Sequence, residues 1–97
     1  MRLKFTPLAE KDLDRIVKYI ARASDRTTAW RYGLKIREKC LEICSAPGMG
    51  KRHPIYPKIR KVIVGAHKIF YREEQDRIVI HRIWDGRRGS QPNLFPR

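Results

Sequence analysis

The spacing of apolar residues changes from every second position to every third or fourth within the first twenty residues. Met1 to Phe5 alternates apolar and basic side chains, which is typical of a half-buried strand. Thr6 and Pro7 then end the strand, because Thr is a favoured helix N-cap and Pro is favoured at the first helical position. We therefore predict a helix from about Pro7 to Ala23. Its apolar face would hold Leu13, Ile16, Val17 and Ile20, and its charged face Lys11, Asp12, Asp14, Arg15 and Lys18.

A second helical pattern covers about Thr28 to Ser45. The cluster Ser24-Asp25-Arg26-Thr27 precedes it and supplies side chains that cap helix N-termini. Because the link between the two helices is short, we expect them to pack antiparallel. Two adjoining apolar stripes run along the second helix, Trp30, Leu34, Leu41 and Cys44 in one and Ile36, Cys40 and Ile43 in the other. Stripes of this kind usually lie in the core, and we expect the same of Trp84 and Phe95.

Three strands follow a region rich in Gly and Pro. Ala46-Pro47-Gly48-Met49-Gly50 ends the second helix, and the chain to Lys58 is predicted to be a loop. The strands are Ile59–Val64, His67–Arg72 and Arg77–Trp84, and their short connections are typical of hairpins. The predicted fold is therefore α+β in the order β-α-α-β-β-β. An antiparallel helical hairpin would pack on one face of a small, mainly antiparallel, twisted sheet.

The chain has 97 residues, which suits one domain, residues 1–97, and we find no internal repeat. Its net charge of +13 comes from 23 Lys and Arg against 10 Asp and Glu. The half from residue 47 onward contributes +8 of this charge. This excess is larger than solubility requires, so we expect an anionic partner. A basic surface that only keeps the protein soluble is the alternative.

Other features limit the class of protein. No stretch reaches the ~18 to 20 apolar residues of a membrane span, and the first residues do not resemble a signal peptide, so we expect a soluble, cytoplasmic protein. Cys40 and Cys44 are four positions apart on a helix, which suits a disulfide poorly, and we expect both to be reduced. His53 and His67 lack partners at ligand spacing. We therefore expect no metal and no cofactor.

Six segments of the chain, in this order, carry a family resemblance. They are Phe5-Thr6-Pro7-Leu8-Ala9-Glu10-Lys11-Asp12-Leu13, Pro47-Gly48-Met49-Gly50, Ile59-Arg60, Val64-Gly65, Ile69-Phe70-Tyr71-Arg72 and Ile83-Trp84-Asp85-Gly86-Arg87-Arg88. Each segment alone is a weak signal, but their order and spacing cover nearly the whole chain. The chain resembles the RelE/ParE toxin superfamily, and most closely its ParE branch.

The resemblance implies a function. Such toxins are small basic proteins that a cognate antitoxin neutralises; ParE-like members poison DNA gyrase, whereas RelE-like members cut messenger RNA in the ribosome. We therefore expect a type II toxin that inhibits gyrase and arrests growth until a ParD-like antitoxin binds it in a hetero-oligomer. The alternative is a ribosome-dependent mRNA endoribonuclease. A third interpretation is a simple nucleic-acid-binding module, although the Phe and Tyr residues follow the core pattern rather than alternating with basic positions.

The gyrase interpretation needs no catalytic residue. Metal-free RNA cleavage needs a base, an acid and cations around the phosphate, and RelE-like nucleases often have a His or Tyr close to the C-terminus. This chain has no His or Tyr after His81, which counts against a nuclease. If it were one, Arg60, Arg72 and Arg82 would hold the phosphate and His81 or Tyr71 would carry the proton. These arginines could instead form ion pairs with Glu73, Glu74, Asp76 or Asp85.

Two sets of residues are candidates for binding partners. For the target they are Trp84, Asp85, Arg87, Arg88, Arg60 and Arg82. Gly86 permits a sharp turn that would present Arg87 and Arg88 outward, although Asp85 could also pair with one of them. For the antitoxin they are Leu3, Phe5, Trp30, Leu34 and Phe95, because one helical hairpin leaves apolar surface and an open strand edge on the sheet.

Overall fold

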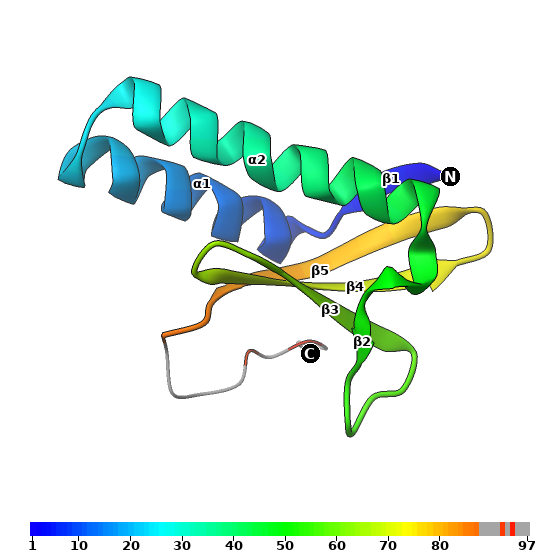
Figure 1. The fold of residues 1–97 in the computed structure, drawn as a ribbon. Coiled ribbons are helices and arrows are strands. Elements are labelled where there is room, and N and C mark those ends of the chain that lie inside the picture. Colours follow the sequence, from blue (N-terminus) through cyan, green and yellow to red (C-terminus); the bar gives the residue numbers. More distant parts are fainter. Residues whose placement is uncertain (88–91, 93, 95–97) are drawn as a thin grey trace.

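The structure is a computed structural model, and it describes residues 1–87, 92 and 94. Its elements are β1 (Arg2–Phe5), α1 (Pro7–Ala23), α2 (Arg26–Ser45), the short 3-10 helix η1 (Pro47–Met49), β2 (Lys51–Arg52), β3 (Ile59–Val64), β4 (His67–Glu74) and β5 (Arg77–Asp85). Figure 1 shows α1 and α2 as an antiparallel pair on one side of the sheet. The predicted α+β fold is thus confirmed.

Side-chain caps fix the starts of both helices. Thr6 Oγ1 accepts a hydrogen bond from the backbone N–H of Ala9 at 3.1 Å, and Pro7 is the first residue of α1, as predicted. In α2 the cap is Asp25, whose Oδ1 accepts from the N–H of Thr28 at 2.7 Å. The helix therefore begins at Arg26, two residues before the predicted start.

The sheet has five strands in the order β1-β5-β4-β3-β2. The first strand pairs in parallel with β5, and the other neighbours are antiparallel. The strand β2 lies in the segment that we predicted to be loop, and that part of the prediction was wrong. A two-residue strand has no periodicity of its own. It is fixed by its pairing with β3, opposite Arg60 and Lys61.

The main core lies between the helical hairpin and the sheet. The predicted stripe of Ile36, Cys40 and Ile43 is fully buried there, against strand residues such as Ile69 and Ile80. The other stripe was predicted to be core, and this was wrong for its two largest exposed members. Trp30 is 65% exposed and Leu41 is 58% exposed, because within the described part of the chain no second layer covers the outer side of α2.

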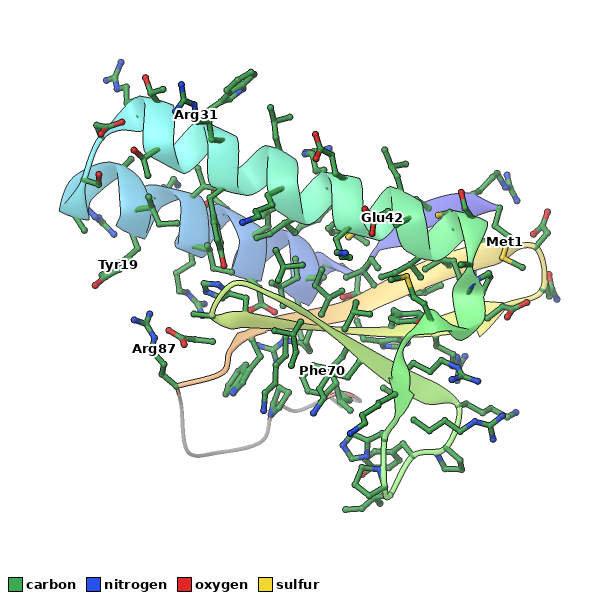
Figure 2. All side chains as sticks on the ribbon, in the orientation of Figure 1. Met1, Tyr19, Arg31, Glu42, Phe70 and Arg87 are labelled. Atoms are coloured by element: carbon green, nitrogen blue, oxygen red, sulfur yellow. The ribbon has the colours of Figure 1, made fainter. Side chains whose placement is uncertain are left out.

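A smaller apolar cluster lies on the face of the sheet away from the helices. It contains Ile59, Phe70 and Leu94, with Trp84 packed against it, and Figure 2 shows Phe70 on this side. Leu94 is 5% exposed, so this residue of the C-terminal tail packs on the sheet. Phe95, which we expected to lie in the core, is outside the described residues.

The cysteines, the possible metal ligands and the two helices were the subject of further expectations. Cys40 and Cys44 are both free thiols, and burial raises the pKa of Cys40 to about 12. Among the described residues, no three His, Cys, Asp or Glu side chains gather as a metal site would require. Within the same part of the chain, neither helix has the length and apolar character that a membrane crossing needs.

Candidate functional site

A buried ion pair holds α1 against the last strand. Arg82 on β5 donates from Nε to Asp12 Oδ2 at 2.8 Å and from a terminal guanidinium nitrogen to Asp12 Oδ1 at 3.0 Å. The backbone N–H of Ile83 also donates to Asp12 Oδ2, at 3.0 Å. Asp12 was predicted to lie on the charged outer face of α1, and this was wrong, because it is only 4% exposed. The hydrogen bond to Asp12 raises the pKa of Arg82.

The turn after β5 is organised by a second, exposed ion pair. Arg87 donates from Nε to Asp85 Oδ1 at 3.0 Å and from a terminal nitrogen to Oδ2 at 2.8 Å, and its backbone N–H also donates to Oδ1. These bonds hold the pKa of the Asp85 carboxyl well below its usual range. Gly86 donates its N–H to the carbonyl of Ala66 at 2.7 Å, which ties the turn to the β3–β4 connection. Arg88 lies outside the described residues.

These two ion pairs border an open pocket of about 600 Å³, which we call the β5 pocket. Its walls come from α1, from Tyr32 on α2, from the β3–β4 turn and from the end of β5. Figure 1 shows the closed end of the helical hairpin extending beyond the sheet above this region. Tyr19, which is 59% exposed, and Arg87 lie at the same end of the molecule (Figure 2). The pocket therefore presents aromatic surface beside a solvent-exposed cation.

The β5 pocket contains a pair of residues that sequence reasoning did not identify. Tyr32 Oη lies 2.6 Å from His67 Nδ1 and donates to the carbonyl of Val64 at 3.0 Å. Burial lowers the pKa of His67 and raises the pKa of Tyr32, so both groups are held neutral near pH 7. No local pattern could have shown this contact, because the two residues are 35 positions apart.

Tyr71 and Arg60, two of the residues that we expected to act in a nuclease, form hydrogen bonds with the segment before β2, which we call the loop before β2 and which includes η1. Tyr71 is fully buried, and its hydroxyl donates to the carbonyl of Pro47 at 2.7 Å and accepts from the N–H of Gly50 at 3.0 Å. Arg60 donates to the carbonyls of Gly48 and Gly50, at 3.3 and 2.8 Å. Burial raises the pKa of Tyr71.

The remaining nuclease candidates lie elsewhere. Arg72 forms an ion pair with Glu74, one of the partners predicted from the sequence. His81 is half-buried, and its pKa is lowered first by burial and then by the charge of Arg72. Arg82 is held by Asp12, which was not among the predicted partners. The five candidates therefore divide among three places, namely the loop before β2, the Arg72–His81 region and the α1–β5 ion pair.

Three of the five antitoxin candidates line one groove beside the helical hairpin. A groove of about 500 Å³, which we call the hairpin groove, runs between α1 and α2 and is lined by Phe5, Trp30 and Leu34 together with apolar residues of α1. Leu3 is not part of this lining and packs half-buried against the main core. Phe95 lies outside the described residues.

A family model and a solved structure that resemble this chain both come from the same kind of toxin-antitoxin system. The family model described as the ParE toxin of a type II toxin-antitoxin system, parDE, matches residues 3–89. A solved structure described as a chromosomal ParDE toxin-antitoxin system from P. aeruginosa superposes with a TM-score of 0.76 at 24% sequence identity, over 88% of this chain and 95% of that one. At this identity the likeness shows the fold. No curated protein matches the chain.

Proposed function

The chain belongs to the ParE toxin family of type II toxin-antitoxin systems, and from this premise we propose that it arrests growth by binding DNA gyrase without chemistry of its own. Gyrase inhibition is the typical activity of this family. The proposal requires a cytoplasmic site of action, where gyrase works on DNA.

The β5 pocket is the observation that carries the proposal. A protein that acts by binding needs an exposed surface with aromatic and cationic groups, which dominate the energetics of protein interfaces. Tyr19 and Arg87 provide such groups at the mouth of the pocket, and Trp84 and Tyr32 lie in its walls. The Asp85 carboxylate fixes the guanidinium of Arg87, which lowers the entropy lost when a partner binds it. We propose that gyrase contacts this pocket.

The arrangement of the nuclease candidates favours binding over cleavage. A catalytic centre needs its proton carrier and its cations around one phosphate. Tyr71 and Arg60 instead hold the loop before β2, while Arg82 joins β5 to α1. These roles are structural, and they do not converge on one cleft.

The partner that neutralises the toxin is an antitoxin, and we propose that it is ParD-like and binds the hairpin groove in a hetero-oligomer. The groove is lined by apolar side chains together with Glu10, Asp14 and Arg37. Trp30, one of its lining residues, is largely exposed, as is common for a surface that a partner covers. With a net charge of +13, the toxin favours an acidic partner.

The test is a supercoiling assay with purified gyrase. We expect the toxin to inhibit supercoiling and to trap gyrase on cleaved DNA. Arg87→Glu and Tyr19→Ala, both at the mouth of the β5 pocket, should each reduce inhibition about tenfold, since hot-spot truncations cost above about 1 kcal/mol. Arg31→Glu removes a cation on the outer side of α2, as Figure 2 shows, and should inhibit like the unaltered toxin.

Three results would contradict the proposal or part of it. Absence of both inhibition and trapped cleavage complexes at saturating toxin would remove gyrase as the target. Cuts in translated messages after induction in cells, with gyrase unaffected, would favour the endoribonuclease alternative. Equal losses for Arg87→Glu and Arg31→Glu would retain gyrase but remove the β5 pocket as the contact.

A further inference from the structure

The middle of the chain is a segment that carries many basic residues and no acidic residue of its own. The thirty residues between Glu42 and Glu73 contain seven Lys or Arg and no Asp or Glu. Most of this charge lies on β2, on β3 and on the loop that joins them, residues 53–58, which we call the β2–β3 loop. Figure 1 shows this loop projecting from the sheet on the side away from the helices.

The cations of β2 and the β2–β3 loop differ in their ion pairing from most arginines of the later strands. Arg72, Arg77, Arg82 and Arg87 each form an ion pair with a carboxylate. Lys51, Arg52 and Lys58 are exposed, and none forms an ion pair with any carboxylate in the described part of the chain. Their charges are therefore available to an anionic partner.

The β2–β3 loop has a fixed shape. His53 Nδ1 accepts hydrogen bonds from the backbone N–H groups of Ile55 and Tyr56, at 3.1 and 3.2 Å. The chain returns to β3 through a bond from the N–H of Ile59 to the carbonyl of Tyr56, at 2.9 Å. Two prolines, Pro54 and Pro57, further restrict the backbone. Such a preorganised loop loses little entropy on binding.

The tip of this loop is apolar and exposed. Ile55 is 72% exposed and Tyr56 is 44% exposed, with the Tyr56 ring 5.2 Å from the His53 ring. We expected the Phe and Tyr residues to follow the core pattern, and for Tyr56 this was wrong. An aromatic and an aliphatic side chain stand here between Arg52 and Lys58.

Exposed cations on either side of an apolar loop tip fit duplex DNA better than they fit an acidic protein surface. A two-stranded ribbon fits the major groove, which is about 12 Å wide. The groove has phosphates along both walls, and the ribbon carries cations on both strands, with an apolar tip between them that can contact base edges. We call β2, the β2–β3 loop and β3 together the β2–β3 ribbon. We propose that this ribbon binds duplex DNA, with Lys51, Arg52 and Lys58 on the phosphates and Ile55 and Tyr56 in the groove.

The position of the ribbon connects it with gyrase, and this step rests on the proposed function. Strands β3 and β5 both pair antiparallel with β4, so the start of β3 and the end of β5 lie at opposite ends of the sheet. The ribbon and the β5 pocket are thus separate surfaces. The toxin can therefore contact gyrase through the pocket while the ribbon contacts the DNA that gyrase holds.

The test measures binding of a fluorescein-labelled 20-base-pair duplex of mixed sequence by fluorescence anisotropy, from 50 to 200 mM salt. The ribbon variant is Lys51→Gln/Arg52→Gln/Lys58→Gln. The control, Arg22→Gln/Arg31→Gln/Lys35→Gln, removes the same charge from exposed residues of the helices. Circular dichroism and thermal unfolding establish that both fold.

We expect the ribbon variant to bind about tenfold or more weakly, with a salt slope reduced by about 2 to 3, since each phosphate contact contributes ~0.9. The control should stay within about twofold of the unaltered toxin with an unchanged slope. Ile55→Ala/Tyr56→Ala should bind more weakly at every salt concentration without a change in slope, because it removes no charge.

Other results would overturn the proposal. Equal losses for the ribbon and control variants would mean that charge over the whole surface attracts DNA, and full affinity of the Ile55→Ala/Tyr56→Ala variant would remove the tip from the contact. A ribbon variant that loses DNA binding but inhibits gyrase fully would overturn the link to gyrase alone. Failure of the unaltered toxin to inhibit gyrase would refute the proposed function and leave the DNA result intact.

Discussion

Arg82 and Asp12, seventy positions apart in the sequence, form a two-point ion pair that joins the last strand to the first helix. The same carboxylate accepts the backbone N–H of Ile83, so it also satisfies a donor on β5. The guanidinium lies 5.2 Å from the centre of the Trp84 ring, at the wall of the β5 pocket. The ion pair therefore fixes both the fold and the shape of the candidate site.

Removing one partner of this ion pair should lower the free energy of unfolding. In Asp12→Ala the buried guanidinium and the Ile83 N–H lose their acceptor, and we expect the free energy of unfolding to fall by about 3 kcal/mol. Urea denaturation measures this loss. The double variant Asp12→Leu/Arg82→Met removes both charges and should recover much of it. A single variant as stable as the unaltered protein would show that the pair contributes little.

Two glycines two positions apart along the chain, Gly48 and Gly50, should differ sharply in their tolerance of a methyl group. A Cβ at Gly50 would lie 2.8 Å from Tyr71 Oη and 2.9 Å from the carbonyl of Lys61. Gly50→Ala should therefore cost about 3 kcal/mol, as overpacking does. A Cβ at Gly48 meets nothing within 4 Å, so Gly48→Ala should change stability by less than about 0.5 kcal/mol. Thermal unfolding compares the two, and equal effects would contradict the packing around Tyr71.

Stability should depend on pH through two histidines. Burial is the main cause that lowers the pKa of both His67 and His81 from the ordinary 6.5. From about pH 6.5 down to the lowered pKa, the unfolded chain binds more protons than the folded one. Stability is therefore full above pH 6.5 and decreases as the pH falls through this window.

The pH dependence can be measured by urea denaturation between pH 7.5 and 5.5. This range lies above the ordinary pKa values of 4.5 and 3.8 of Glu74 and Asp85, whose lowered pKa values act at more acid pH. In His67→Asn/His81→Asn we expect a flatter dependence of stability on pH, whatever its absolute stability. An unchanged slope would exclude these two groups as its source.

Local chemistry explains which parts of the fold the sequence could predict. The cap formed by Thr6 and Pro7 and the pairing of Arg87 with Asp85 involve residues close in the chain, and both were anticipated. The end of β5 was therefore recognisable as a turn that presents a cation. The two-residue β2 was missed because its pairing with β3, rather than its own composition, makes it a strand.

Contacts between distant segments could not be predicted in this way. Asp12 has charged neighbours in the sequence, so periodicity assigned it to the outer face, although Arg82 draws it into the α1–β5 interface. The apolar stripe through Trp30 was assigned to the core, because periodicity shows which face of a helix is apolar but not whether another layer covers it. Tyr32 and His67 meet only once the hairpin is placed on the sheet.

Trp30 and Leu41 provide the sharpest test of the hairpin groove, because both are large, exposed apolar residues of α2 and only Trp30 lines the groove. Trp30→Ala should weaken antitoxin binding at least about tenfold, since buried aromatic anchors at interfaces cost about 2 kcal/mol or more. Leu41→Ala should bind like the unaltered toxin. Isothermal titration with the purified antitoxin gives both affinities.

Because the two side chains are exposed, neither change should alter the unfolding temperature of the free toxin by more than a few degrees. If the two variants lost affinity equally, the antitoxin would bind along the whole outer side of α2; if neither did, it would bind elsewhere.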